Sequence, residues 1–443
     1  MKRKLYESLK RYKKLNRSSF HTPGHKSNVF GKSGILSLDY TELPLTDSLY
    51  EASGIIKRAE DDLTKLYGSK KSVFSSGGNT LCIQTMLALV AKSGEKILCD
   101  RLVHRSAVSA MALLDIDPVW IKREYSKNSR LFEKINIKDL KEKLNQKASY
   151  KAFYTTSPSY YGILQDINLI SQECSKKNVP VLVDNAHGSH LKFMEKSLHP
   201  LDMGAAMSAD SAHKTLPVLT GGAWLHINDS RFCEDVKNKM VLFGSTSPSY
   251  VIMSSMDIAR DWLKNYGEKE FEKLKNKVQN IKNLAKEKGI FIPDENIFDP
   301  VRITLGIWKV GYSGYEFREH LYKYGVEPEF CDSNYAVLIV TPFNTREDFK
   351  RLKKALINLK IKEEKKADFE FGFKMPEKIA TIREAVMAET IKVNINEAVG
   401  KIAGEIACPC PPGVPVIMPG EKISDYEQEV LRKYGISKIN VLK

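Results

Sequence analysis

Short apolar runs alternate with helical patterns along the first half of the chain, and this alternation restricts the folds that the chain can adopt. The expected strands are residues 72–76, 96–100, 119–122, 152–156, 181–184 and 206–209. Helical patterns lie between them, notably at 81–91 and 168–177. Strands that alternate with helices predict an α/β fold with a mostly parallel sheet, which collects ligands at the carboxyl ends of its strands.

One expected strand, Val181-Leu182-Val183-Asp184, ends in an acid. Three aliphatic residues in a row are typical of a parallel strand that is buried on both faces. A carboxylate at the end of such a strand can keep a pyridine nitrogen protonated, which makes pyridoxal 5'-phosphate (PLP) an electron sink. Asp184 is therefore a candidate partner for this cofactor.

A lysine in an apolar setting lies about thirty residues further on, in Ser211-Ala212-His213-Lys214-Thr215-Leu216-Pro217-Val218. Burial in an apolar pocket lowers the pKa of an amine, so that the amine can attack a carbonyl and form a Schiff base. The alternative is an ordinary surface lysine in a loop. The preceding acid favours the chemical interpretation, because a strand-end acid and an apolar lysine together are the skeleton of a PLP site.

Two further polar features follow expected strands. The turn Gly77-Gly78-Asn79-Thr80 precedes a helix, an arrangement in which backbone N–H groups can hold a phosphate. His104 follows the strand 96–100, and its flat ring could stack on an aromatic cofactor. The alternative for His104 is a residue that caps the N-terminus of a helix.

Composition excludes several classes of protein. The chain has 443 residues, 42% of them hydrophobic, and roughly two to four domains or lobes are expected. Because no apolar run approaches the ~20 residues of a membrane span and the start lacks a secretory pattern, we predict a cytoplasmic protein. Seven scattered cysteines argue against disulfides, and the close pair Cys408 and Cys410 does not suggest a zinc site, so no metal is expected.

The formal net charge of +15 raises the possibility of a nucleic-acid-binding protein. The lysines are mixed with glutamates, as in residues 268–288, which favours solvated helix faces instead. Shifts in pattern predict four parts. These are an N-terminal arm (1–45), a large cofactor-binding domain (46–260), a smaller α+β domain (261–362) and a C-terminal α+β segment (363–443).

Ser211-Ala212-His213-Lys214-Thr215-Leu216-Pro217 resembles the cofactor-lysine signature of the bacterial-type ornithine/lysine/arginine decarboxylases. Further motifs match that family in order and span nearly the whole chain. The chain resembles the short form of these decarboxylases. They are residues 21–26, 156–162, 184–188, 246–250 and 411–421. The resemblance implies the aspartate-aminotransferase fold (fold type I) for the large domain and PLP as the cofactor.

The resemblance also implies roles for individual residues. Lys214 would bind the cofactor aldehyde, Asp184 would pair with the pyridine nitrogen, and His104 would stack on the ring. Thr246 would reach the phosphate from a neighbouring subunit, so that a homodimer or higher homo-oligomer shares its active sites, and Glu421 would face the distal cation of the substrate. The remaining cofactor-binding residues would be Gly78, Asn79, Thr80, Ala186, His187, Ser211 and His213.

Two departures from the family pattern lie where substrate selection is plausible. Tyr50, in Asp47-Ser48-Leu49-Tyr50, replaces a histidine, and Cys410 replaces an aromatic residue before Pro411-Pro412-Gly413. The expected reaction is decarboxylation of a basic L-amino acid, with arginine (to agmatine) favoured over lysine or ornithine, for polyamine biosynthesis. Lys214, His213 or Cys410 would return a proton to Cα. The alternative is an aminotransferase on the same fold, in which Arg302 would hold the substrate carboxylate.

Overall fold

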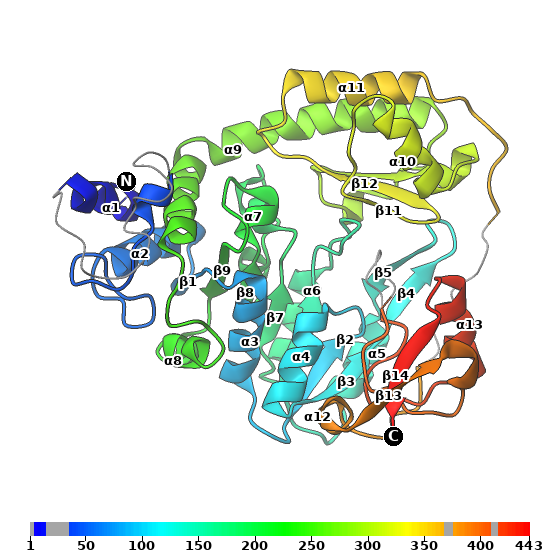
Figure 1. Cartoon of the computed structure of the whole chain (residues 1–443), viewed down its shortest axis with the longest axis horizontal. Coiled ribbons are helices and arrows are strands. Elements are labelled where there is room, and N and C mark those ends of the chain that lie inside the picture. The colour runs from blue at the N-terminus through cyan, green and yellow to red at the C-terminus, as the bar shows by residue number, and fades with distance from the viewer. Residues whose placement is uncertain (1–3, 15–34, 367–374, 409–414) are drawn as a thin grey trace. The chain divides into compact units, whose positions relative to one another are not determined.

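The computed structural model describes residues 4–14, 35–366, 375–408 and 415–443 (Figure 1). The motif at 21–26, Cys410 and residues 411–414 lie outside the described residues. The chain forms two compact units, one of residues 1–90 and 180–271, the other of residues 91–179 and 272–443. The four-part division given above remains a prediction.

The first unit contains a sheet region in the order β1-β9-β8-β7. Its strands are β1 (Lys71–Ser75), β7 (Val181–Asp184), β8 (Met207–Asp210) and β9 (Ala223–Ile227). Strand β7 pairs parallel with β8, whereas β9 runs antiparallel to both β8 and β1. Every residue of β7, β8 and β9 is buried, which explains their uniformly apolar or hydrogen-bonded composition.

Helices connect and cover these strands. They are α1 (Lys4–Lys14), α2 (Ile55–Tyr67), α3 (Gly78–Val90), α7 (Ala212–Thr215), α8 (Val236–Val241) and the first part of α9 (Tyr250–Glu287). Helix α2 ends at Gly68, whose φ of 67° is a left-handed conformation that glycine adopts without steric penalty. Helix α3 starts directly after β1, as the Gly77-Gly78 turn predicts.

The second unit begins with three parallel strands in the order β6-β2-β3, joined by helices. These are β2 (Lys96–Asp100), β3 (Asp117–Ile121) and β6 (Tyr150–Thr156), with α4 (Arg105–Leu114), α5 (Ile137–Leu144) and α6 (Ile167–Ser175). An antiparallel hairpin of β4 (Arg123–Ser126) and β5 (Leu131–Ile135) follows β3. The predicted strands of both units are confirmed within about two residues, which is the usual uncertainty of element ends.

The second unit also holds a small antiparallel sheet in the order β10-β12-β11. Its elements are β10 (Arg302–Gly306), α10 (Gly314–Tyr322), β11 (Phe330–Cys331), β12 (Tyr335–Ile339) and α11 (Arg346–Ile357). The predicted α+β character of this region is confirmed. Side chains Ser313 and Thr345 form capping boxes with Glu316 and Asp348, which fix the starts of α10 and α11.

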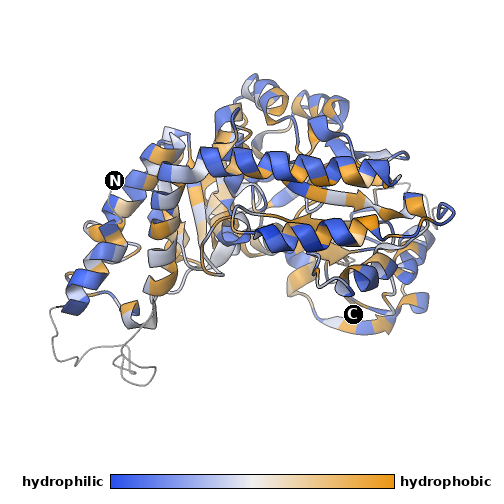
Figure 2. Cartoon of the chain, turned by 90° about the horizontal axis from the view of Figure 1, so that it is seen from above, coloured by the Kyte–Doolittle hydropathy of each residue, from blue (hydrophilic) through white to orange (hydrophobic). Residues whose placement is uncertain are grey.

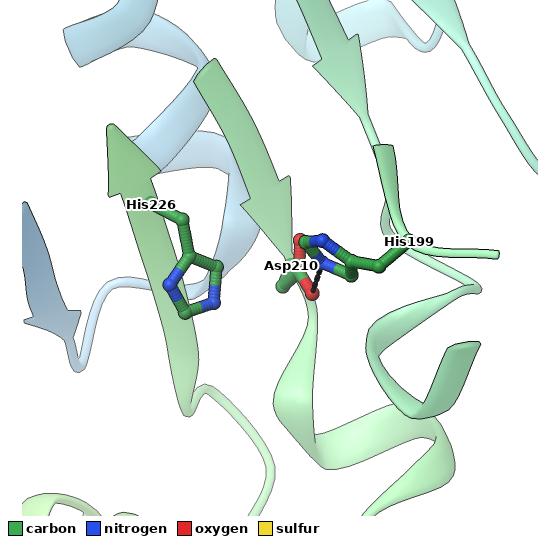
Figure 3. A group of neighbouring side chains, drawn as sticks. All are labelled: His199, Asp210 and His226. Carbon is green, nitrogen blue, oxygen red and sulfur yellow. Dashed lines mark hydrogen bonds and ion pairs between the residues drawn. The ribbon is translucent and has the colours of Figure 1, made fainter. Parts of the chain in front are cut away.

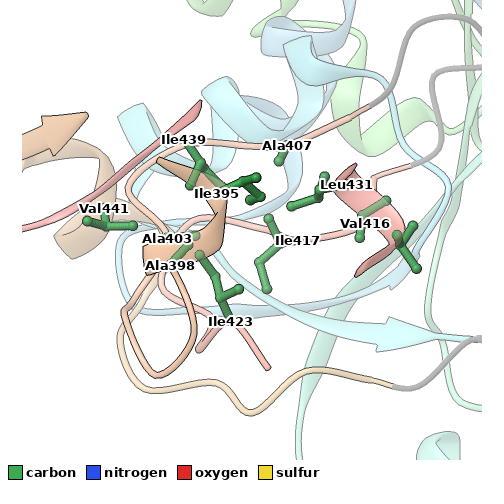
Figure 4. Close-up of a cluster of buried hydrophobic side chains, with 11 residues drawn as sticks. Ile395, Ala398, Ala403, Ala407, Val416, Ile417, Ile423, Leu431, Ile439 and Val441 are labelled. Atoms are coloured by element: carbon green, nitrogen blue, oxygen red, sulfur yellow. The ribbon is translucent and has the colours of Figure 1, made fainter. Parts of the chain in front are cut away.

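The C-terminal residues form a separate hydrophobic core (Figure 4). Their elements are α12 (Ile382–Met387), β13 (Thr390–Asn394), α13 (Asp425–Lys433) and β14 (Lys438–Leu442), with β13 and β14 antiparallel. The core side chains include Ile395, Ala403, Ile417, Ile423, Leu431, Ile439 and Val441. The C-terminal segment therefore has its own packed interior, as expected for an α+β domain.

The helices of both units carry hydrophobic and hydrophilic residues in alternation (Figure 2). Such helices pack one face against a core and expose the other. Among the described residues, no helix combines the length and the apolarity that crossing a bilayer requires.

Candidate active site

Asp184 lies at the carboxyl end of β7 and is only 1% exposed. Its Oδ1 accepts a hydrogen bond of 2.8 Å from the Asn79 side-chain amide and one of 3.2 Å from the Ala186 backbone N–H. Two donors aimed at one carboxylate oxygen stabilise the ionised form of an acid and fix its orientation. Asp184 is thus held in one orientation at the end of a buried strand.

Lys214 projects from the short helix α7, directly after β8. Its Nζ lies 3.0 Å from Nε2 of His187, and Lys214 is half-buried. The neighbouring His213 places Nδ1 3.0 Å from the Gly222 carbonyl oxygen, so Nδ1 carries the proton and donates it. His187 follows Asp184 in the same loop, so the amine of Lys214 contacts the segment that begins at Asp184.

The turn before α3 has the features of an anion-binding site. Gly78 has a φ of 70°, and a Cβ added there would meet no atom within 4 Å, so the backbone faces open space. The Gly78 N–H is bonded to the Gly221 carbonyl, whereas the next N–H groups of the first helical turn have no intrahelical acceptor. Thr80 is exposed and can add a hydroxyl donor. Ser211 is 1% exposed in the turn before Lys214.

Asn79 is a predicted cofactor-binding residue, and the structure directs its side-chain Nδ2 to Asp184, because the first turn of α3 presents this side chain to the end of β7. Its Oδ1 is buried and has no hydrogen-bond partner among the described residues. Since Oδ1 can only accept, the Asn79 side chain supports Asp184, and phosphate binding would fall to backbone N–H groups, Thr80 and Ser211.

These residues fit PLP in their chemistry. One unit supplies an oriented carboxylate for a pyridine nitrogen, an amine for an aldehyde and a glycine turn at a helix N-terminus for a phosphate. Asn79 Oδ1 is a buried polar atom that has no partner within the described chain, as expected beside a ligand site.

Tyr50 and Thr246 belong to neighbouring loops of the same unit. The Tyr50 hydroxyl lies against Gly244, where an added Cβ would be 1.9 Å from the oxygen, and Thr246 is exposed two residues further on. The Asp47 carboxylate accepts backbone N–H groups from Ser53, Gly54 and Ile56, which fixes the Tyr50 loop against the start of α2. These hydrogen bonds lower the pKa of Asp47, against the opposing effect of burial.

His104 belongs to the second unit, where it is the N-cap of α4. Its Nδ1 accepts from the Ser106 backbone N–H at 3.2 Å and lies 2.7 Å from Ser106 Oγ, and the residue is exposed. The alternative that we considered, a capping histidine, is therefore confirmed. Stacking on the cofactor remains a prediction that this geometry permits, because capping occupies one ring nitrogen and leaves the ring exposed.

Glu421, the predicted contact of the substrate's distal cation, is paired with an arginine. Glu421 is 3% exposed, and its two carboxylate oxygens lie 2.6 and 2.7 Å from the two terminal nitrogens of Arg101, which is fully buried. A bidentate buried pair of this kind neutralises the carboxylate. Glu421 is thus a partner of Arg101 in the structure, and its contact with the distal cation of a substrate stays a prediction.

Arg302, the carboxylate anchor of the alternative aminotransferase reading, starts β10 and is 2% exposed. Its Nε lies 3.7 Å from the carboxylate of Asp299, which is fully buried. Arg302 is therefore buried beside an acid. Burial lowers its pKa, and the Asp299 charge opposes that effect.

A buried cluster behind the Lys214 turn was missed by sequence reasoning. His199 Nε2 lies 3.0 Å from the Asp210 carboxylate, and His226 approaches from strand β9 (Figure 3). All three side chains have no exposed surface, and their polar atoms lie within 4.8 Å of one another. Their donor types suit a divalent cation, yet the residues are closed to solvent and Asp210 already binds His199 and Ser208. No sequence spacing signals this group, because a 3-10 helix and two strands bring it together.

From the burial of His226 we predict that the free energy of unfolding falls in acid. Burial lowers the pKa of His226 to about 3, from 6.5 in an exposed histidine, despite the opposing charge of Asp210. The unfolded chain therefore binds one more proton than the folded chain between these values. The free energy of unfolding should fall with decreasing pH by about 1.4 kcal/mol per pH unit from this residue, starting near pH 6.5.

Urea unfolding at pH 7, 6 and 5 checks this prediction, with His226→Gln as the matched variant without the titrating ring. The variant should lose less stability on acidification than the unchanged protein. Equal slopes for the two proteins would show that His226 already titrates normally in the folded state.

Comparisons with known proteins agree with this geometry. Residues 4–301 match the family model "Orn/Lys/Arg decarboxylase, major domain", and residues 369–434 match "Orn/Lys/Arg decarboxylase, C-terminal domain". The chain is 32% identical to the uncharacterized protein YaaO of Bacillus subtilis, over 99% of this chain and 95% of that one. It is 29% identical to the arginine decarboxylase of the same organism, over 95% and 91% of the two chains.

The structure is similar to the crystal structure of the Francisella novicida lysine decarboxylase LdcF, with a TM-score of 0.83 and 19% identity. The match covers 99% of this chain and 81% of that one. At this identity the likeness shows the fold, which confirms the predicted PLP fold type I. The chain therefore belongs to the Orn/Lys/Arg decarboxylase family of PLP-dependent enzymes.

Proposed function

We propose that this protein decarboxylates a basic L-amino acid with PLP as its cofactor, and that arginine is the preferred substrate. The observation that carries the proposal is the arrangement around the β7 end, where Asp184 is oriented by Asn79 and His187 contacts the Lys214 amine at 3.0 Å. An acid and an amine in one buried region are what this cofactor requires from a protein.

The proposed roles of the residues follow from their chemistry. Lys214 binds the aldehyde, and Asp184 keeps the pyridine nitrogen protonated. When bound, the cofactor withdraws electrons from the substrate Cα, so that the carboxylate can leave as CO2. Gly78, Thr80 and Ser211 hold the phosphate, His104 covers the ring, and the Ala186–His187 segment fixes Asp184 and contacts Lys214.

The Cα atom needs a proton after CO2 has left, and two residues are placed to supply it. Lys214 has three donor positions, and its contact with His187 Nε2 fixes the direction of one. His213 donates Nδ1–H to the Gly222 carbonyl, so Nε2 is the ring atom that remains for proton exchange. We assign the proton return to one of these two groups. Cys410, the third candidate, lies outside the described residues.

Arginine is favoured because the chain is similar, over most of its length, to an arginine decarboxylase of comparable size. Substrate selection would involve Tyr50, and Thr246 would complete the phosphate site of a neighbouring subunit in a homodimer. The exposed position of Thr246 and its nearness to the Tyr50 loop support this arrangement. A cytoplasmic role in polyamine synthesis is part of the same proposal.

The proposal is tested by an assay of the purified, PLP-loaded protein with L-arginine, L-lysine and L-ornithine in parallel. CO2 release and amine formation are measured together with keto-acid formation. We expect agmatine and CO2 in equal amounts from arginine, with slower turnover of the other two. Keto acid without CO2 would support the aminotransferase alternative, which is not favoured because Arg302 is already paired with Asp299.

A further inference from the structure

The loop between β2 and α4 carries His104, and its shape depends on the C-terminal domain. We propose that Glu421 and Arg101 are positioning residues, which set the place of the His104 ring from the C-terminal domain. This inference rests on the proposed function, because it takes His104 to cover the cofactor. It gives Glu421 a role besides the substrate contact that the resemblance implies.

The Arg101–Glu421 pair has the geometry of a fixed anchor. Both terminal nitrogens of the guanidinium meet both carboxylate oxygens, at 2.6 and 2.7 Å, and the Met418 backbone N–H donates to Oε2 at 2.8 Å. Arg101 is 0% and Glu421 3% exposed. Removing one partner from such a pair leaves the other as a buried, uncompensated charge, so the segment around it must move.

Arg101 has little freedom to move without its loop. Its backbone N–H is bonded to the Ile121 carbonyl, and its guanidinium lies 5.1 Å from the centre of the Trp120 ring. Only Leu102 and Val103 separate it from His104, and Val103 is 2% exposed. A shift of the Arg101 side chain is therefore passed to the N-cap of α4 through a connection of two residues, of which Val103 is buried.

The C-terminal domain also holds the other end of α4. Helix α12 packs against α4 (Figure 1), and the Arg383 guanidinium donates to the carbonyls of Ala112 and Leu113 at 3.1 and 3.0 Å. A cation at a helix C-terminus satisfies carbonyls that lack intrahelical donors. The helix that begins at His104 is thus fixed at both ends by residues of the same domain.

The test measures the dissociation constant of PLP by absorbance titration of the apoprotein. Glu421→Gln keeps the shape of the side chain and removes the charge that holds Arg101. We expect PLP binding to weaken by about fivefold to tenfold, the range expected when ring stacking is lost. Glu405→Gln is the matched control, since Glu405 binds Asn440 within the same domain and does not contact the His104 loop. It should change the dissociation constant by less than about twofold.

A double-mutant cycle with His104→Asn separates positioning from general destabilisation. If Glu421 acts through His104, the second substitution should have little further effect in the Glu421→Gln protein, so that the two effects are not additive. Additive effects, or unchanged PLP affinity in Glu421→Gln, would overturn the inference. If Glu421→Gln does not fold, Glu421→Asp keeps the charge and shifts the carboxylate, and the same cycle applies.

Different results would contradict the positioning role of Glu421 and the ring-covering role of His104. If His104→Asn weakens PLP binding and Glu421→Gln does not, only the positioning role is wrong. If His104→Asn itself leaves PLP affinity unchanged, the proposed ring-covering role of His104 is wrong, and the positioning role with it.

Discussion

Lys214→Ala should abolish both the visible absorbance of bound PLP and the decarboxylase activity. The side chain contributes the amine that binds the aldehyde, and this amine lies 3.0 Å from His187 Nε2. We expect kcat/KM to fall by about a thousandfold or more, because both covalent binding and a proton donor are lost. Measuring the absorbance spectrum and CO2 release on the same preparation checks both effects.

Lys192→Ala is a suitable control for this prediction. Lys192 is a half-buried lysine of the same unit, and its amine is paired with Asp202 at 2.7 Å rather than with the site. Its loss should leave the spectrum and the activity within about twofold of the original, as for an ordinary ion pair near the surface. Turnover retained by the Lys214→Ala protein would remove Lys214 from the mechanism.

Asp184→Asn should separate the two effects. The variant should still bind the cofactor, but it should have little decarboxylase activity. An asparagine at this position still offers Oδ1 to the Asn79 amide and the Ala186 N–H, so the local structure should persist. It lacks the negative charge that keeps a pyridine nitrogen protonated. We expect kcat to fall by about a thousandfold while Lys214 still binds the aldehyde, measured by spectral titration and by CO2 release.

Asn79→Ala provides a graded comparison. It removes one hydrogen bond to the ionised Asp184, which contributes about 1.5–3 kcal/mol in comparable cases, so the loss of activity should be about tenfold to a hundredfold. If Asp184→Asn kept nearly full activity, the protonation of the ring would have to come from another group.

Local patterns in the sequence predict the strands and the residues that follow them. The run Val181–Asp184 is read correctly as a buried parallel strand, because three aliphatic residues suit a strand covered on both faces. The position of Lys214 shortly after a strand is also predicted, because residues 206–209 are read as a strand and β8 spans Met207–Asp210. These features depend on neighbours in the sequence, which is why they can be recognised there.

Partnerships between distant residues could not be predicted in this way. The direction of the Asn79 amide depends on where the start of α3 lies relative to the end of β7, and the Asn79-Thr80 pair in the sequence does not distinguish its two side-chain donors. The cluster of His199, Asp210 and His226 depends on the pairing of β8 with β9. Glu421 was assigned from a motif, and its burial against Arg101 could only be seen in the folded chain.

The separation of 320 residues between Arg101 and Glu421 has a consequence for the order of events during synthesis. A growing chain that has produced α4 and the whole of the Lys214 region still lacks the counter-ion for its buried guanidinium. The loop that carries His104 can therefore adopt its final conformation only after the C-terminal domain has been synthesised and has packed against it. Nascent chains should acquire tight affinity for PLP late, and ribosome-bound intermediates should remain largely without it.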